Sequence, residues 1–300
     1  MKKYLYIIVC ATLILISTTV VKASNEVYYT NKRNIQMTEQ EYNNLLSLGF
    51  SNKDIARMDQ EEFDLNKNLE GEILDEQVKY IENTTYMQNG IKSIRSREIT
   101  REEAMREKEL HSQNPSYRGP VGSYYNGLYY NTIIEETTRI VGISNTYMRY
   151  HTKTEWIVMP DERYHDIIGI GIESDKVEIA TSVIFRENWT LDNDDDDYTE
   201  VCYPKSTSTG GLAIFELPDE DIIDLNAYLY FNVKKKSGVG TITSLYAAGD
   251  YAHGVCSNVD PSDLYYHVTV GPSAGILIDS TYDLCFIQQS PAVASFIGTW

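Results

Sequence analysis

Cysteine is scarce in this 300-residue chain, which has only four such residues. Cys10 lies within an N-terminal apolar segment, and only Cys202, Cys256 and Cys285 lie beyond it. Three thiols form one intramolecular disulfide at most, so a disulfide-rich scaffold is excluded. A domain of this size buries enough apolar surface to fold without such links. The sequence leaves open whether Cys256 pairs with Cys202, pairs with Cys285 or remains a reduced core residue.

Basic residues are also under-represented. The chain has 26 Lys and Arg against 44 Asp and Glu, a formal net charge of -18. Without Lys2, Lys3 and Lys22 the balance is 23 against 44, and the net charge becomes -21. This charge repels nucleic acids and anionic membranes, so we expect no nucleic-acid partner. It favours solubility outside the cell, and it attracts cations such as Ca²⁺ or a basic partner.

Long apolar runs are absent except at the N-terminus. Lys2 and Lys3 precede the mostly apolar stretch Tyr4 to Val21, and small or branched residues occupy the positions before Ser24. This pattern is typical of a secretory signal peptide, here cleaved after Ala23. A membrane helix needs about 20 apolar residues, and no second run of that length follows. We therefore expect a secreted, extracellular protein with no membrane span after cleavage.

Established catalytic motifs are missing as well. The chain contains no nucleophile elbow, zinc-protease motif or phosphate-binding loop, so we assign no catalytic residue and no cofactor. One segment combines a carboxylate, an imidazole and a thiol in Asp250, His253 and Cys256. Such groups form nucleophilic or metal sites when they converge in space. Their spacing matches no established local signature, and the sequence does not favour catalysis here.

The first segment after the leader, residues 24–71, has the features of a small helical unit. Thr38 and Glu41 form a capping box, apolar residues follow at helical spacing, and Gly49 is a natural stop. Ser51 is placed to cap a second short helix, with Phe50 at the joint between the two. About 30 residues bury too little surface to be firmly stable alone. We expect this unit to pack against another part of the chain.

The remainder divides by composition into a connector and a β domain. Residues 72–122 are charged and are expected to be a connector, with a capping box at Thr100 and Glu103 and a Pro- and Gly-containing linker at its end. Residues 123–300 alternate apolar and polar positions, as in 148–158, 177–185, 229–233 and 266–270. Many short alternating strands predict a mainly β protein whose C-terminal domain is an antiparallel β-sandwich or jelly roll, preceded by the small helical unit.

The sequence also resembles a group of proteins. Residues 37–50 (MTEQEYNNLLSLGF), with Tyr28, Tyr29 and the later stretches 156–159 and 166–171, resemble segments of uncharacterised secreted proteins of Gram-positive bacteria. The likeness covers about a quarter of the chain. It implies secretion and a bacterial source, and it implies no activity and no catalytic residue.

Two features of the composition suggest binding sites. Tyrosine is abundant, with 24 residues against 7 phenylalanines, and Tyr228, Tyr230 and Tyr265 would project from strand faces. Such rings suit glycan or protein recognition, although tyrosine is also common on partly solvent-exposed faces of β-sheets. An acidic run after Leu191 places Asp192, Asp194 and Asp196 where they could bind Ca²⁺. The run lacks the glycine of an EF-hand loop, and a solvated hairpin loop is the simpler interpretation.

These observations predict an exported, non-catalytic extracellular protein that binds a glycan or a protein through a tyrosine-rich β face. A secreted hydrolase whose site is assembled only in space is the alternative. A self-assembling or pore-forming protein is a third class, suggested by the long alternating strands. The oligomeric state is left open.

Overall fold

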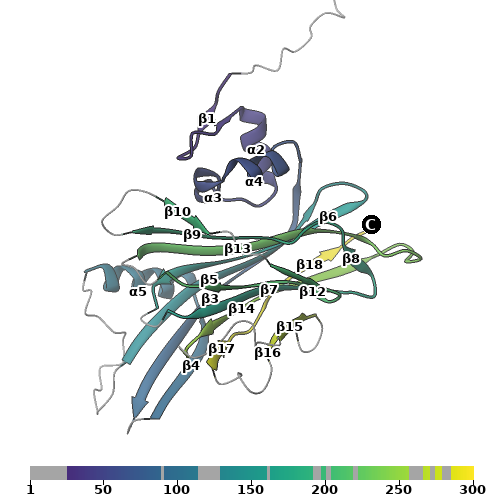
Figure 1. Ribbon diagram of the computed structural model, residues 1–300. Coiled ribbons are helices and arrows are strands. Elements are labelled where there is room, and N and C mark those ends of the chain that lie inside the picture. Colours follow the sequence, from purple (N-terminus) through teal and green to yellow (C-terminus); the bar gives the residue numbers. More distant parts are fainter. Residues whose placement is uncertain are drawn as a thin grey trace, which may run out of the picture.

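The protein consists of two packed antiparallel β-sheets with a group of short helices on one outer face (Figure 1). This computed structural model describes residues 26–88, 91–113, 129–160, 163–191, 197–200, 204–218, 222–256, 266–270, 274–278 and 285–300. The fold class predicted from the sequence is confirmed: the protein is mainly β, its sheets are antiparallel and packed together, and the helical region is small and N-terminal.

The first sheet contains eight strands, and every strand pair within it is antiparallel. β8 (Val177–Ile179) lies beside β13 and off the main path. In spatial order the other seven are β10 (Asp197–Glu200), β9 (Ile184–Leu191), β13 (Ile222–Lys235), β6 (Tyr147–Val158), β5 (Tyr129–Gly142), β3 (Glu72–Gln88) and β4 (Ile91–Ile99).

The second sheet contains six strands, and two further strands lie outside it. β18 (Ala292–Ile297) pairs with the first half of β14, and the short strands β15 (Tyr266–Thr269) and β16 (Gly275–Ile278) form a separate hairpin. The main path runs β11 (Lys205–Thr207), β12 (Gly210–Glu216), β7 (His165–Ile172), β14 (Ser244–Gly254) and β17 (Phe286–Gln288).

The main core lies between the two sheets, as the period-two pattern predicts. Leu229, Phe231 and Val233 of β13 are fully buried there together with Ile168 and Ile170 of β7. Because successive side chains of a strand point to opposite faces, the residues between them face outward from the sandwich. On the second sheet the hairpin β15–β16 covers this outer face, and its Val268 and Ile276 are buried.

Side chains of the first sheet close one side of the sandwich. The free edge of β18 would expose unpaired backbone donors. Gln77 accepts a hydrogen bond from the amide of Val293, and Asp75 Oδ2 accepts one from the amide of Ser295 at 2.5 Å. Side-chain oxygens of β3 therefore accept the hydrogen bonds that a neighbouring strand would otherwise accept from β18.

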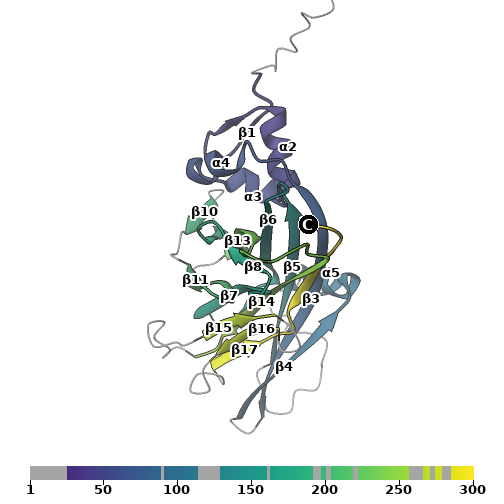
Figure 2. The same ribbon diagram turned by 90° about the vertical axis from the view of Figure 1, so that its right-hand side faces the viewer.

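The N-terminal part forms a compact unit, which we call the helical unit (residues 29–66). It contains the short strands β1 (Tyr29–Thr30) and β2 (Gln36–Met37) and the helices α2 (Glu39–Ser47), α3 (Asn52–Arg57) and α4 (Gln60–Asn66). The capping box predicted at Thr38 is present, and Ser51 caps α3 as predicted, with Asp54 completing a capping box there too. Gly49 ends α2 with a φ of 95°, which favours glycine. In both views this unit lies over the outer face of the first sheet (Figure 2).

Residues 72–99 differ from the expected charged connector because they form β3 and β4. Their polar side chains have partners in the sheet: buried Glu82 accepts from Asn131 at 2.8 Å and pairs with Arg97. α5 (Arg101–Gln113) follows, and Thr100 caps it as predicted. Ala104 of α5 packs with buried apolar residues of β4, β5 and β6.

Candidate functional site

The predicted tyrosine face lies on the outer side of the first sheet. Tyr228 and Tyr230 of β13 share one face, and their rings stack with centroids 6.4 Å apart. Both side chains are buried, with exposed fractions of 1% and 3%, because the helical unit packs over them. Phe50 meets both rings edge-on, at centroid distances of 6.0 and 5.5 Å. The open aromatic surface expected from the sequence is therefore occupied by the chain's own N-terminal unit.

Both tyrosine hydroxyls have partners in α4. The Tyr228 hydroxyl donates to Glu62 Oε2 at 2.8 Å, and Asn66 Nδ2 donates to the Tyr230 hydroxyl at 3.0 Å. Burial raises the pKa of Tyr228 well above its ordinary value, and the charge of Glu62 adds to the effect. Burial also raises the pKa of Glu62 to about 7, although Arg186 and Tyr228 oppose the rise. Hydrogen bonds of both tyrosine hydroxyls therefore join β13 to α4 within the chain, although Glu62 Oε1 and Asn66 Oδ1 are buried there without a hydrogen-bond partner among the described residues.

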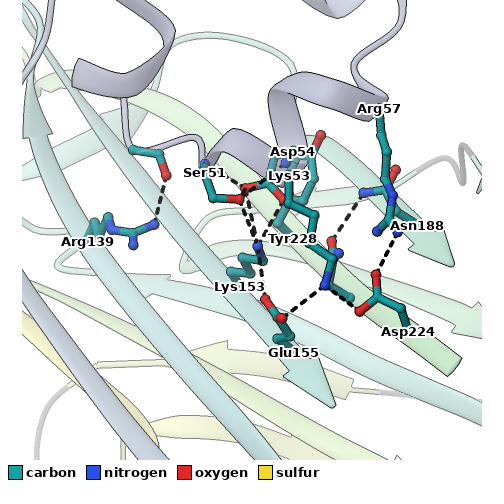
Figure 3. A network of polar contacts seen from close by, with 12 residues as sticks. Ser51, Lys53, Asp54, Arg57, Arg139, Lys153, Glu155, Asn188, Asp224 and Tyr228 are labelled. Atoms are coloured by element: carbon teal, nitrogen blue, oxygen red, sulfur yellow. Dashed lines mark hydrogen bonds and ion pairs between the residues drawn. The ribbon is translucent and has the colours of Figure 1, made fainter. Parts of the chain in front are cut away.

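Ion pairs surround this contact and hold α3 on the sheet (Figure 3). Asp54 lies 2.9 Å from Lys153 Nζ on β6, and both side chains are largely buried. Burial alone would raise the pKa of Asp54, but Lys153 and the bonds from Ser51 outweigh it and lower the pKa. Nearer the solvent, Lys53 binds Glu155 at 3.0 Å and also pairs with Asp224.

His151 lies beneath the same contact and is fully buried. Its ring is about 6 Å from those of Phe50, Tyr228 and Tyr230. Burial lowers the pKa of His151 well below its ordinary value, and Arg139 adds to the lowering. The imidazole is therefore neutral and serves as part of the aromatic packing.

The structure separates Asp250, His253 and Cys256. Cys256 is bonded to Cys285, so its thiol is not available as a nucleophile or ligand. Asp250 and His253 are three positions apart on β14 and so project from opposite faces. Asp250 accepts from the amide of Ile276 at 2.6 Å, whereas His253 Nδ1 lies 3.0 Å from Asp166 Oδ1. The three residues therefore have different partners and do not form one site.

His253 and Asp166 form part of a buried polar cluster. Tyr251 donates its hydroxyl to Asp166 Oδ2, and the amide of Gly254 donates to Asp166 Oδ1 at 2.9 Å. Asp166 and Tyr251 are fully buried, and His253 is 5% exposed. The cluster pairs buried polar groups with one another, and none of its three side chains lines either of the two hollows described below.

Several predicted site residues fall outside the part of the chain that the structure describes. They are Tyr265, Cys202 and the three acidic residues Asp192, Asp194 and Asp196. Within the described ranges, no group of three or more His, Cys, Asp and Glu side chains is arranged to hold a metal ion.

A groove on the second sheet was not anticipated from the sequence. It has a volume of about 630 Å³ and lies beside the end of the β15–β16 hairpin, next to residues 172–175 at the end of β7. Tyr246 of β14 is 40% exposed in it. Apolar residues, small polar residues and two carboxylates complete the lining, namely Ile172, Glu173, Ser174, Asp175, Thr209, Thr269, Val270, Ala274 and Val293. We call this feature the Tyr246 groove.

The rim of the Tyr246 groove is fixed by hydrogen bonds. Glu173 Oε2 accepts from the amide of Tyr246 at 2.9 Å, and Glu173 Oε1 binds Lys176 at 2.7 Å. The amide of Ile172 donates to the carbonyl of Thr209 at 2.9 Å. A Cβ on Gly171 would come within 2.5 Å of the Thr269 carbonyl, so glycine permits the hairpin to approach β7. The groove is therefore formed in advance of any ligand.

A second hollow, of about 610 Å³, lies beside the start of α2. Its walls are mostly polar and include Glu39, Glu41 and Lys67. Glu41 is already engaged in the capping box of Thr38, at 2.8 Å from its amide. Because the Glu41 carboxylate already caps α2, this hollow is a weaker candidate for ligand binding than the Tyr246 groove.

Comparisons with known proteins reveal only distant similarity. No protein-family profile matches, and no curated protein sequence matches significantly. A solved structure described as "pH-induced modulation of Streptococcus parasanguinis adhesion by Fap1 fimbriae" is 11% identical, with 55% of this chain and 80% of that chain covered and a TM-score of 0.24. Another, described as "BspA_C_mut", is 8% identical, with 72% and 83% covered and a TM-score of 0.27.

At these identities and TM-scores, both similarities are distant. In the part of the chain that the structure describes, no helix is long and apolar enough to cross a membrane.

Proposed function

We propose that the protein is an exported, non-catalytic binding protein whose ligand occupies the Tyr246 groove. The single observation that carries this proposal is the groove itself. Its half-exposed tyrosine stands beside apolar walls and a rim already fixed by hydrogen bonds. Concave, preformed and mostly apolar surfaces with a few polar groups are where ligands bind.

The compartment supports the same proposal. The Cys256–Cys285 disulfide is typical of proteins that work in an oxidising environment outside the cytoplasm. The N-terminal leader predicted from the sequence would deliver the chain there. A tyrosine in a preformed groove contributes contact area and a hydrogen-bonding hydroxyl at low entropic cost, which suits an extracellular binding protein.

Of the tyrosine and aspartate residues singled out in the sequence, those that the structure describes do not line the Tyr246 groove. Tyr228 and Tyr230 bind the helical unit, so an external ligand would first have to displace that unit. Recognition through Tyr265 stays a prediction. Binding of Ca²⁺ by Asp192, Asp194 and Asp196 also stays a prediction, and calorimetric titration of the wild type and of Asp194→Asn/Asp196→Asn with Ca²⁺ tests it.

An array experiment tests the proposed function. The purified protein without its leader is applied to immobilised extracellular proteins, peptides and glycans, in parallel with Tyr246→Ala and Tyr147→Ala. Tyr147 is a matched control because it is 39% exposed and lies on the other sheet. We expect bound targets for the wild type and for Tyr147→Ala, and a loss of about tenfold or more in affinity for Tyr246→Ala.

Two results would contradict the proposal. One is binding that Tyr246→Ala leaves unchanged, because the ligand would then lie elsewhere. The other is turnover of an arrayed peptide or glycan by the wild type, which would favour a secreted hydrolase.

A further inference from the structure

We infer that the Tyr246 groove recognises a lysine or arginine side chain presented by a basic peptide segment. This inference rests on the proposed function and names the chemistry of the ligand. It draws on three properties of the groove: its charge, its apolar walls and its aromatic ring.

The charged side chains of the lining itself are acidic, and two lysines lie beside them. The described residues of the lining include the two carboxylates Glu173 and Asp175 and no lysine or arginine. Glu173 is neutralised by Lys176, which also donates to the carbonyl of Ser244 at 3.1 Å. The nearby Lys236 donates to the carbonyl of Ser174 at 2.9 Å. Asp175 is exposed and is the carboxylate left to meet a cation from the ligand.

The walls suit the stem of a long cationic side chain. Val270, Ala274 and Val293 are half-buried in the lining and offer apolar surface beside Asp175. Lysine and arginine cover apolar surface with their methylene stems while their charged ends reach a polar partner. A purely apolar ligand would leave the carboxylate unpaired, and an acidic ligand would be repelled by it.

The ring of Tyr246 adds a third contact. A cation near the face of a tyrosine ring is attracted by the electron density of that face. The net charge of -18 also draws basic partners toward the protein from a distance. Both contributions favour a cation over a neutral ligand of the same shape.

Three short peptides provide the test. They are Ac-Ser-Val-X-Val-Ser-NH₂, in which X is lysine, norleucine or glutamate. Norleucine keeps an apolar stem and lacks the charge. Each is titrated into the ¹⁵N-labelled protein at low salt, and amide chemical shifts are followed. We expect the shifts to cluster at residues 172–175, Thr209 and Tyr246. We expect the lysine peptide to bind on the order of fivefold more tightly than the norleucine peptide, and the glutamate peptide least tightly.

Variants separate this inference from the proposed function. Asp175→Asn should abolish the preference for lysine over norleucine while norleucine still binds, and Tyr246→Ala should weaken both peptides. Asp64→Asn, on the remote helix α4, should change neither. Equal binding of the lysine and norleucine peptides in the groove would overturn the inference and leave the proposed function standing. Shifts that avoid the groove with all three peptides, together with array binding that ignores Tyr246→Ala, would overturn both.

Discussion

The buried ion pair between Asp54 and Lys153 offers the sharpest test of how the helical unit is held. Asp54 is fully buried, and Lys153 Nζ lies 2.9 and 3.3 Å from its two oxygens. Removal of one partner from a buried pair costs about 3–5 kcal/mol, because the other charge stays in a poorly solvated site. Here each partner keeps other contacts: Asp54 accepts two bonds from Ser51, and Lys153 lies 3.3 Å from Glu155. We therefore expect about 3 kcal/mol, at the lower end of that range, for Asp54→Asn and for Lys153→Met.

A double-mutant cycle measures the interaction itself. The double variant Asp54→Asn/Lys153→Met leaves no unpaired charge, so its loss should be smaller than the sum of the single losses by at least about 1 kcal/mol. Urea denaturation followed by circular dichroism gives the free energy of unfolding, and amide hydrogen exchange in α3 reports local opening of the unit.

The exposed neighbour Lys53 supplies the control. Its side chain is 33% exposed and its partners Glu155 and Asp224 are 32% and 21% exposed. Lys53→Met should cost no more than about 1 kcal/mol. If Asp54→Asn and Lys153→Met cost as little as Lys53→Met, or if their losses simply add, then the buried pair does not fasten the unit to the sheet and our reasoning is refuted.

Two further predictions concern pH and the disulfide. The pKa of Glu62 rises from 4.5 to about 7 on folding, so the folded state holds its proton more tightly and stability falls as pH rises through that window. At about 1.4 kcal/mol per pH unit, the wild type should lose about 3 kcal/mol relative to Glu62→Gln between pH 4.5 and 7, and a constant difference in urea titrations would count against this. Cys256→Ser/Cys285→Ser opens a loop of 29 residues and should cost about 3–4 kcal/mol, so an unchanged Tm in calorimetry would show that the disulfide adds no stability.

The sequence predicted those elements whose two faces differ in polarity. Residues 148–156 of β6 and 229–233 of β13 alternate, because one face enters the apolar core and the other, which carries polar and tyrosine side chains, meets the helical unit or solvent. The capping box at Thr38 and the helix cap at Ser51 depend on local hydrogen bonds, so they too could be predicted from the sequence. What these patterns could not reveal is that the helical unit covers Tyr228 and Tyr230, since burial of that face depends on residues more than 150 positions away.

Other elements gave no such signal. β14 is buried on both faces and is rich in alanine and glycine, so it shows no alternation. A Cβ on its Gly249 would come within 1.9 Å of Thr138 Oγ1, which explains a small residue there. β3 is rich in charged residues, and several of them form ion pairs with the neighbouring strands: Lys79 with Glu98, Glu82 with Arg97 and Glu76 with Arg139. The Tyr246 groove is lined by residues from five separate segments, so no local sequence motif could predict it.

Hydroxyl-radical footprinting of the tyrosines tests the central claim most directly, namely that the recognition surface is the Tyr246 groove and that the Tyr228 and Tyr230 face is closed by the helical unit. We predict that Tyr246 and Tyr147 are modified at similar rates, that Tyr228 and Tyr230 are strongly protected, and that the lysine peptide protects Tyr246 alone. Modification of Tyr228 and Tyr230 as fast as that of Tyr246 in the native protein would contradict the account.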